Sequence, residues 1–375
     1  MVRVGVVGGG QLARMMIPAA INLGFDLRVF AESEVCSARA AHTVVGDYAN
    51  AEELLAFATD VDVLTFDHEH VSGGVLSTLT DRGVVLYPTA EALALTHDKA
   101  LMRSTLSALG YPQPRWTVVD GGPIPQQEID AVGGFPLIAK KPVGGYDGKG
   151  VRQVNVVDDL SDWLEEGPVL LEEKVNFRRE LSQLSARNSQ GDWIAWDLVQ
   201  TLQENGVCAE VIAPAPDLPL GLTQLAGDLA RNMAYDLGVV GVFAIELFET
   251  QEGQLLVNEL AMRPHNSGHV FTELSVTSQF EQHLRAVAGF PLGSTRSLTS
   301  YGVMVNIFGQ VDEAGARAAY RADPDVKIHD YMKEARAGRK AGHVVAVGEN
   351  YQDLVARCKD AAARIRQPDY DGDHE

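Results

Sequence analysis

Two short apolar runs, each carrying one glutamate, are joined by a polar turn in the second half of the chain. The runs are Val242–Phe248 and Leu255–Ala261, and the glutamates are Glu246 and Glu259. Apolar runs of this length around a turn with polar residues and glycine predict a β-hairpin with one carboxylate on each strand. The chain must therefore contain antiparallel sheet in this region.

The expected register of this hairpin places both glutamates on one face. We expect Glu249 to pair with Gln254 across the turn. Glu246 then lies opposite Val257, and Glu259 follows two residues along the same face. Two carboxylates among Val, Ile, Leu and Phe repel and lose hydration unless a cation neutralises them, and oxygen ligands suit magnesium, which also holds substrate phosphates. The pair predicts a magnesium–nucleotide site; the alternative is a hairpin whose glutamates face solvent or a basic partner.

The composition narrows the class of protein. A chain of 375 residues with 46% hydrophobic and 22% charged residues has room for two or three globular domains. Its formal net charge of -20 argues against a nucleic-acid or acidic-membrane partner. The three cysteines have no metal or redox spacing, and no apolar stretch is long enough to span a membrane. We expect a cytoplasmic protein.

Strands and helices alternate through the first hundred residues, whereas the following segments are richer in antiparallel strands. Alternation predicts a parallel sheet with right-handed crossovers. The expected fold class is thus α/β followed by α+β. The expected strands of the first part are Val2–Val7, Asp26–Phe30, Val61–Phe66 and Val84–Tyr87, with a helix at Leu12–Leu23. The expected domains are 1–97, 98–290 with a glycine-loop subdomain at about 115–185, and 291–366, with a disordered tail at 367–375.

A glycine-rich turn follows the first strand and opens a helix. Gly8 to Ala13 satisfies the pattern G-x-G-x-x-A, and Glu32 lies downstream where a ribose contact is expected. Alone, this pattern predicts a nicotinamide-dependent dehydrogenase. Any tight strand-to-helix turn that binds an anion needs the same glycines, so the pattern leaves both interpretations open.

A second glycine-rich segment follows the lysine that ends another strand. Lys140 precedes Gly144–Gly150, a loop that carries Lys149. Glycines let backbone N–H groups approach phosphate oxygens, which the two ammonium groups would neutralise. The Walker A spacing is absent, so this is a different kind of phosphate loop. A hairpin turn with an exposed lysine is the alternative.

Two further segments support a nucleotide-binding function when they are considered together with these motifs. The strand end at Glu172–Glu180 offers backbone groups for an adenine ring and carboxylates for a ribose, although alone it is an ordinary strand end. The segment Asp330–His343 concentrates positive charge in an acidic chain and would suit a substrate phosphate. A solvated basic turn is the alternative there.

The order of the motifs resembles a known family. GGGQLARM, Asp98-Lys99, GGYDGKG, EEKVNF, IELF, NELA, RPHNSGH and GRKAGH follow one another along nearly the whole chain. Together they resemble the 5-(carboxyamino)imidazole ribonucleotide synthetases, ATP-grasp enzymes of purine biosynthesis. The resemblance implies an ATP-grasp fold with an N-terminal Rossmann-like domain and a small C-terminal domain, ATP and Mg²⁺ as cofactors, and a homodimer.

The resemblance also implies roles for individual residues. Glu246 and Glu259 would bind magnesium, and Lys149 would lie on the loop that closes over the phosphates. Arg263, His265 and Asn266 would act at the transferred groups together with Lys149. ATP would contact Lys99, Lys140, Gly144, Gly145, Gly148, Glu172, Val175 and Glu180. The aminoimidazole ribonucleotide would contact Gln11, Glu69, Tyr146, Asp147, Lys333, Arg339 and Lys340, the last three through its 5′-phosphate.

Three positions depart from the family pattern. Ala13 stands where glycine is frequent, Lys99 where arginine is frequent, and Met262 where a proline commonly precedes the arginine. None removes a required charge, so the resemblance implies an active enzyme.

The implied reaction needs no protein nucleophile. Bicarbonate would attack the γ-phosphate of ATP, and the resulting carboxyphosphate would carboxylate the exocyclic amine of the ribonucleotide. Such a reaction depends on positioning and on charge neutralisation. The alternatives are a related ATP-grasp ligase that activates formate or another carboxylate, the nicotinamide dehydrogenase, and a catalytically silent binding module.

Overall fold

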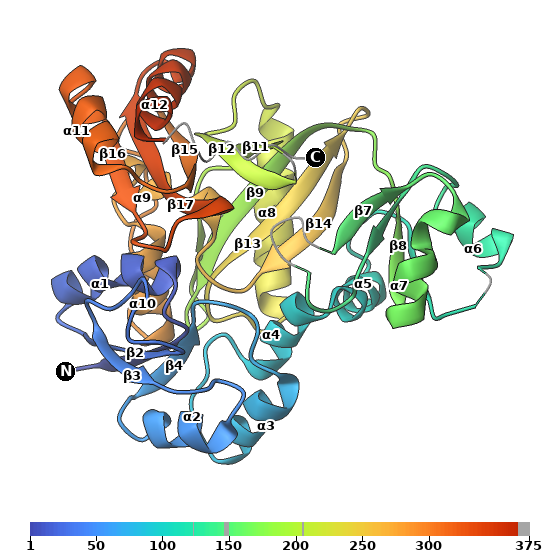
Figure 1. Cartoon of the computed structure of the whole chain (residues 1–375), viewed down its shortest axis with the longest axis horizontal. Coiled ribbons are helices and arrows are strands. Elements are labelled where there is room, and N and C mark those ends of the chain that lie inside the picture. Colours follow the sequence, from blue (N-terminus) through green and yellow to red (C-terminus); the bar gives the residue numbers. More distant parts are fainter. Residues whose placement is uncertain (123, 146–149, 205, 367–375) are drawn as a thin grey trace.

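Three β-sheets organise the chain. The computed structural model describes residues 1–122, 124–145, 150–204 and 206–366. A parallel sheet forms the N-terminal part, a long antiparallel sheet runs through the middle, and a small sheet stands at one end, opposite the C-terminal helices (Figure 1). The mixture of a parallel sheet with two antiparallel sheets confirms the expected fold class.

The N-terminal sheet has four strands in the order β3-β2-β1-β4. All its pairs are parallel, as the alternation of strands and helices predicted. Its strands are β1 (Arg3–Val7), β2 (Asp26–Ala31), β3 (His42–Val45) and β4 (Val63–Phe66). Its helices are α1 (Gln11–Leu23), α2 (Ala51–Ala58) and α3 (Gly73–Asp81), and α4 (Ala90–His97) and α5 (Lys99–Ala108) lead out of it.

The sequence was misleading at two strands of this sheet. The expected strand Val84–Tyr87 is wrong: only Leu86 makes a β-bridge, to Leu64. Pro88 follows directly and has no N–H to donate, so the ladder ends there. Strand β3 was missed because it is a short edge strand whose side chains are mostly exposed, which removes the apolar signal.

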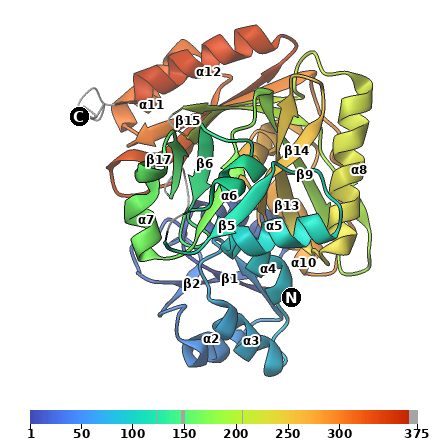
Figure 2. The same ribbon diagram turned by 90° about the vertical axis from the view of Figure 1, so that its right-hand side faces the viewer.

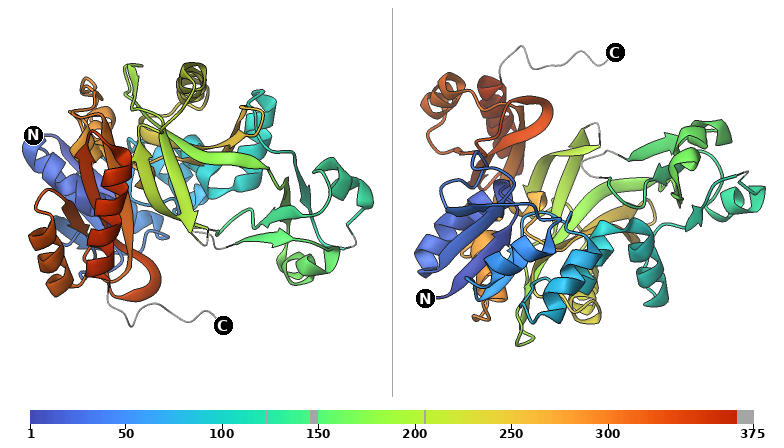
Figure 3. Two further views of the ribbon diagram at one scale, coloured as in Figure 1. Left: turned by 90° about the horizontal axis from the view of Figure 1, so that it is seen from above. Right: turned by 60° about the horizontal axis from the view of Figure 1, so that its bottom comes forward.

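The small sheet is an antiparallel unit in the order β5-β8-β6-β7. Figure 3 shows it projecting from the rest of the molecule, to which the chain connects it after α5 and again between β8 and β9. It ends at Glu173, before the expected limit of about 185, because the next strand pairs in the large sheet. Its elements are β5 (Trp116–Val119), α6 (Gln126–Ala131), β6 (Leu137–Lys140), β7 (Val151–Val154), η1 (Val157–Leu160), α7 (Ser161–Glu166) and β8 (Val169–Glu173).

The large sheet is continuous from the glutamate hairpin to the C-terminal domain. Its order is β14-β13-β9-β11-β12-β15-β17-β16, and β12 pairs with β15 across the expected domain boundary. Its strands are β9 (Phe177–Arg187), β10 (Trp193–Ala195), β11 (Val199–Glu204), β12 (Val207–Ala213), β13 (Gly241–Thr250), β14 (Leu255–Ala261), β15 (Tyr301–Gly309), β16 (Lys327–Asp330) and β17 (Arg336–Gly348).

Helices cover this sheet and connect it to the N-terminal part. Helix α8 lies along the end of the large sheet that contains the hairpin, and α12 packs on β15 and β17 at the other end of this sheet (Figure 2). Helix α10 packs against α1, and Phe280, Leu284 and Val287 complete a core formed mainly by β1, β2 and α1. The helices are α8 (Leu220–Asp236), η2 (Asn266–Gly268), α9 (Phe271–Leu274), α10 (Gln279–Val287), α11 (Glu313–Ala322) and α12 (Tyr351–Ile365).

Candidate active site

The two hairpin glutamates lie directly opposite each other. Glu246 on β13 pairs with Glu259 on β14, so both side chains point to the same face of the sheet, as expected. The expected register was wrong, because Glu249 pairs with Leu255. A bulge at Asn258 restores the common face: the register shifts between Glu246 and Leu247, which leaves one extra residue on β14.

Two lysines from outside the hairpin contact the edge strand β14. Lys99 Nζ donates to Glu259 Oε1 at 2.6 Å, and Lys140 Nζ donates to the side-chain oxygen of Asn258 at 3.2 Å. Lys99 is placed by α5, whose first turn is capped by the Asp98 carboxylate. Lys140 ends β6 of the small sheet. The structure therefore brings both lysines to the acidic pair, and it adds Asn258, which the sequence did not single out.

Glu172 is bound by two cations. Its Oε1 accepts from Arg103 Nε at 2.7 Å, and its Oε2 lies 2.8 Å from Lys140 Nζ. Burial alone would raise the pKa of Glu172, but the charges and hydrogen bonds of Lys140 and Arg103 lower it to about 2. Both carboxylate oxygens are thus engaged, and the predicted contact of Glu172 with adenine stays a prediction.

Arg103 is a functional candidate that the sequence analysis missed. Its guanidinium also donates to the main-chain oxygens of Val257 at 2.9 Å and Asn258 at 2.7 Å. It therefore links α5, the end of the small sheet and the bulge of β14. The available signal was its spacing of four residues from Lys99, which places both side chains on one face of a helix.

The loop after β14 folds back over the face that carries Glu246. His265 Nε2 lies 3.1 Å from Glu246 Oε1. Ser267 Oγ lies 2.8 Å from Ser182 Oγ, and Ser182 is the partner of Glu246 on β9. Burial would raise the pKa of Glu246, but the hydrogen bond from His265 and the charges of Lys340 and Lys140 hold it below its ordinary value. The carboxylate is therefore ionised and suited to a cation.

Other predicted residues border the same face. Burial and the charge of Glu246 raise the pKa of Glu180 on β9 to about 7. Val175 lies between β8 and β9, half-buried. Asn266 Nδ2 and Arg263 Nε are buried donors without a hydrogen-bond partner of normal geometry among the described residues, although Arg263 Nε lies 3.3 Å from Glu69 Oε1. Donors in this state suit a ligand rich in oxygen atoms.

The N-terminal glycine turn is occupied by a carboxylate of the chain itself. The main-chain N–H groups of Gly10 and Ala13 donate to the two oxygens of Asp67 at 2.7 and 2.8 Å. A Cβ at Gly10 would lie 2.0 Å from Asp67 Oδ2, so the glycine is needed for this internal contact. The helix N-terminus already binds an anion, which argues against the dinucleotide interpretation. Gln11 opens α1 beside it.

The basic residues of the C-terminal segment do not all lie near the same carboxylate. The charge of Lys340, on β17, helps to lower the pKa of Glu246. Lys333 acts instead on Asp67 in the N-terminal domain: burial raises the pKa of Asp67, and the charge of Lys333 opposes this rise. Arg339 precedes Lys340 on β17 and is half-buried. These residues border the site from the C-terminal side, and their assignment to a 5′-phosphate stays a prediction.

The glycine loop is described at its two ends. Val143 forms a β-bridge with Asp98, and the N–H of Lys99 donates to the main-chain oxygen of Pro142 at 2.9 Å. Gly144 and Gly145 follow, so the loop leaves directly beside the start of α5. Tyr146, Asp147, Gly148 and Lys149 lie outside the described residues.

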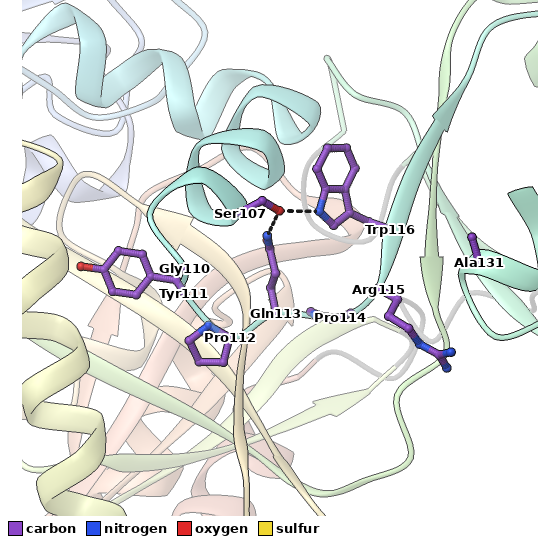
Figure 4. A pocket seen from close by; sticks show the side chains of 9 residues that line it. All are labelled: Ser107, Gly110, Tyr111, Pro112, Gln113, Pro114, Arg115, Trp116 and Ala131. Atoms are coloured by element: carbon purple, nitrogen blue, oxygen red, sulfur yellow. Dashed lines mark hydrogen bonds between the residues drawn. The ribbon is translucent and has the colours of Figure 1, made fainter.

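A surface groove lies away from the acidic pair. An open groove of about 500 Å³ lies at the linker between α5 and β5. There Ser107 Oγ accepts from Gln113 Nε2 at 2.8 Å and from Trp116 Nε1 at 3.1 Å (Figure 4). None of the predicted site residues that the structure describes lines this groove. The groove lies where the small sheet joins the rest of the chain. The candidate site is therefore defined by the side-chain geometry around Glu246 and Glu259.

These features define an ATP-grasp protein with an additional domain at each end. The ATP-grasp domain family matches residues 104–280, the ribonucleotide synthetase preATP-grasp domain matches 1–97, and the phosphoribosylaminoimidazole carboxylase C-terminal domain matches 302–357.

The relatives narrow the class further. N5-carboxyaminoimidazole ribonucleotide synthase of Mycobacterium tuberculosis is 44% identical, covering 96% of this chain and 86% of that protein. The structure of the synthetase from Thermus thermophilus has a TM-score of 0.88 at 32% identity, covering 97% of this chain and 99% of that chain. The structure of the Aspergillus clavatus synthase in complex with ADP and 5-aminoimidazole ribonucleotide has a TM-score of 0.86 at 27% identity, covering 97% of this chain and 99% of that chain. The chain belongs to the N5-carboxyaminoimidazole ribonucleotide synthase family.

The described residues lack two further features. None of their helices is both long and apolar enough to cross a membrane. They contain no cluster of three or more His, Cys, Asp or Glu side chains arranged for a metal ion. Two carboxylates are nevertheless an ordinary protein contribution to a Mg²⁺ ion that is also held by phosphates and water.

Proposed function

We propose that this chain catalyses the ATP-dependent carboxylation of 5-aminoimidazole ribonucleotide by bicarbonate. The products are N5-carboxyaminoimidazole ribonucleotide, ADP and phosphate. The observation that carries the proposal is the common face of Glu246 and Glu259, with Lys99 at one glutamate and His265 at the other. This arrangement supports a phosphate-binding role for Lys99 and a role in the reaction for the loop that carries His265, on either side of one acidic pair.

The acidic pair fits magnesium. Glu246 is ionised, Glu259 is its direct cross-strand partner, and the Asn258 side-chain oxygen lies on the bulge between them. Oxygen donors of this type suit a hard cation. We infer that Glu246 and Glu259 hold Mg²⁺, with Asn258 close by. When bound, the ion neutralises charge on the phosphates of ATP.

The first step transfers a phosphoryl group. An oxygen of bicarbonate attacks the γ-phosphorus, the bond to the β–γ bridging oxygen breaks, and ADP leaves. Lys99 and Lys140 bind and orient the phosphates, and their ammonium groups offset the charge that spreads over the transferred group. We infer that the loop that begins at Gly144 excludes water from carboxyphosphate, and the start of the loop beside Lys99 supports this role.

The second step forms the new carbon–nitrogen bond. The exocyclic amine of the ribonucleotide attacks the carboxyl carbon, either of carboxyphosphate or of CO2 released from it, phosphate leaves, and the amine loses a proton. Arg263 and Asn266 offer buried donors to the oxygens of the intermediate. We infer that Glu69 and Gln11 of the N-terminal part orient the ribonucleotide, and that its 5′-phosphate is bound from the C-terminal segment by Lys333, Arg339 and Lys340.

Substitution of one metal-binding glutamate tests the proposal. Glu259→Gln keeps the shape of the side chain but removes its charge, so we expect ADP release to fall by about 100-fold or more. The matched control is Glu252→Gln in the exposed turn of the same hairpin, which we expect to be fully active. ADP release is measured with bicarbonate and aminoimidazole ribonucleotide omitted in turn. An active Glu259→Gln variant would contradict the metal assignment, and activity with formate but not bicarbonate would contradict the proposed substrate.

Two properties beyond the reaction are also proposed. The chain would work in the cytoplasm, where purine nucleotides are made, and it would form a homodimer. Sedimentation at micromolar concentration tests the second statement, and a monomer throughout that range would contradict it.

A further inference from the structure

We propose that Gln279, at the start of α10, is the positioning residue that fixes His265 and the loop around it. The inference rests on the proposed function, because it assigns a role in that reaction. Gln279 follows the N-cap Ser278 and contacts none of the predicted ATP-binding residues through a described hydrogen bond. Its side chain is 0% exposed.

The amide of Gln279 closes a ring of hydrogen bonds with the main chain of His265. The N–H of His265 donates to Gln279 Oε1 at 2.8 Å, and Gln279 Nε2 donates to the oxygen of His265 at 2.9 Å. A main-chain N–H can only donate, so the atom facing it must be the amide oxygen. The orientation of the amide is therefore fixed by the backbone.

The second N–H of the same amide reaches His269. Gln279 Nε2 lies 2.9 Å from His269 Nδ1. Since Nε2 can only donate, His269 Nδ1 must carry a lone pair and the proton must lie on its Nε2. The ring of His269 stacks on His343 of β17 with centroids 4.8 Å apart. The amide of Gln279 thus uses both of its donors and its oxygen, and its three hydrogen bonds span both ends of the segment from His265 to His269.

The loop that carries His265 also passes close to the amide of Gln279. A Cβ at Gly268 would lie 2.4 Å from Gln279 Oε1 and 2.6 Å from a methyl group of Leu184. A side chain at this position would therefore push the loop away from the glutamine. The absence of a side chain lets the backbone pass directly over the amide.

The consequence of this anchoring lies at Glu246. With its main chain held by Gln279, the His265 ring directs Nε2 to Glu246 Oε1 at 3.1 Å. His265 Nδ1 lies 3.4 Å from the N–H of Ser267 and 2.9 Å from Ser267 Oγ. Since the N–H can only donate, these contacts favour the tautomer in which Nδ1 accepts and Nε2 carries the proton. Gln279 thus sets the position of a proton donor beside the acidic pair. Lys99 and Lys140 approach that pair from another direction and do not depend on it.

Gln282 provides a matched control on the same helix. It is also 0% exposed, and its amide also closes a ring with main chain: the N–H of Gly293 donates to Oε1 at 2.7 Å, and Nε2 donates to the oxygen of Gly293 at 2.8 Å. The two glutamines share burial, helix and bonding pattern. They differ in the segment that they hold, since Gly293 lies outside the candidate site.

The test compares Gln279→Glu with Gln282→Glu. Each substitution replaces a donating NH2 group by an oxygen within the same shape, so we expect similar losses of thermal stability. We expect only Gln279→Glu to lower kcat for the carboxylated product, by about 100-fold, because a small displacement of a reacting group has an effect of that size. The KM for ATP should change less than about threefold. The ratio of ADP released to carboxylated product should rise, because carboxyphosphate would be lost to water.

A spectroscopic readout separates the role of Gln279 from the proposed reaction. In ¹⁵N-labelled protein, Gln279→Glu should shift the ring resonances of His265 and His269, whereas Gln282→Glu should not. Gln279→Leu, which lacks donors and charge, repeats the test if the glutamate variant does not fold. Equal kcat losses at Gln279 and Gln282, or unchanged histidine resonances in the Gln279 variants, would overturn the inference. A wild-type chain without carboxylation activity would instead contradict the proposed function, while the resonances still test the anchoring.

Discussion

Two buried polar clusters are connected to the candidate site, and they tolerate burial in opposite ways. The cation cluster consists of Arg103, Lys140 and Glu172, and it remains charged because each oxygen of the glutamate has its own cation. The ring cluster consists of His269, His343 and Tyr331, and it remains neutral. A buried charge needs complete pairing, whereas a buried ring can give up its charge.

The ring cluster shows this in its pKa values. Burial lowers the pKa of His269 and of His343 well below the ordinary value, and the charge of His329 acts in the same direction. Burial raises the pKa of Tyr331 well above its ordinary value. His343 lies between His269 and His329, with ring centroids 4.8 and 4.5 Å away. The stack therefore joins the reaction loop to β16 and β17 through two rings, His269 and His343, that burial keeps neutral.

The largest expected effect comes from breaking the cation cluster. Arg103→Met would leave Glu172 with one cation and two main-chain oxygens without their donor. Removing one member of a buried ion pair typically costs about 3–5 kcal/mol, so we expect a loss of that order in the free energy of unfolding. The KM for ATP should rise as well, because Glu172 positions Lys140. Urea unfolding and ATP-dependent kinetics measure the two effects.

An exposed pair on α11 is the control for that experiment. Arg317 and Glu313 form an ion pair at 2.6 Å with side chains that are 68% and 81% exposed. Arg317→Met should change the free energy of unfolding by less than about 1 kcal/mol. If Arg103→Met costs no more than Arg317→Met, complete pairing is not what stabilises the cation cluster.

The same contrast explains what the sequence could and could not predict. Glu246 and Glu259 were found because carboxylates within apolar strands stand out in the sequence, and Lys140 because it ends such a strand. Lys99 was found only through the family resemblance, and the structure brings all four residues together. The bulge at Asn258 was not predicted because one extra residue in a strand leaves the apolar pattern almost unchanged. The expected facing of the two glutamates was right although the register was wrong.

Buried polar residues inside helices were missed for a different reason. Arg103 lies in α5 and Gln279 in α10, where arginine and glutamine are ordinary helix residues. Their importance comes from partners about 70 and 14 positions away in the chain, Glu172 and His265. Asp67 similarly fills the glycine turn from 57 positions away, so a pattern typical of dinucleotide binding belongs here to an internal contact. Only the tertiary structure reveals such pairs.

The two clusters should lose their contributions to stability in different pH ranges. The unfolded chain protonates histidine near its ordinary pKa of 6.5, while His269 and His343 stay neutral in the folded protein. The unfolded state therefore binds more protons below that pH, and stability must fall as the pH falls, by up to about 1.4 kcal/mol per pH unit for each such histidine. Glu172 has a pKa of about 2 against an ordinary 4.5, so its contribution is lost only below about pH 4.5.

The variant that tests this order is His343→Phe. It keeps an aromatic ring in the stack but cannot be protonated. Between pH 6.5 and 4.5, the slope of the unfolding free energy against pH should therefore decrease by an amount that corresponds to the uptake of up to one proton. His42→Phe removes an exposed imidazole from the edge strand β3 and should leave the slope as it is. Urea unfolding at several pH values measures the slope. An unchanged slope in His343→Phe would mean that this ring is not held neutral by burial.

The smallest expected effect concerns the hydrogen bond inside the ring cluster. Tyr331 Oη lies 2.7 Å from His343 Nδ1, and Tyr331→Phe removes this contact while keeping the ring. Deleting one partner leaves a buried nitrogen without a hydrogen bond, which costs about 1–3 kcal/mol. No charge is left unpaired, so the loss should be smaller than for Arg103→Met, and the KM for ATP should not change. Parallel urea unfolding of both variants measures the difference. A loss in Tyr331→Phe as large as in Arg103→Met would show that a neutral cluster is no more tolerant of a missing partner than a charged one.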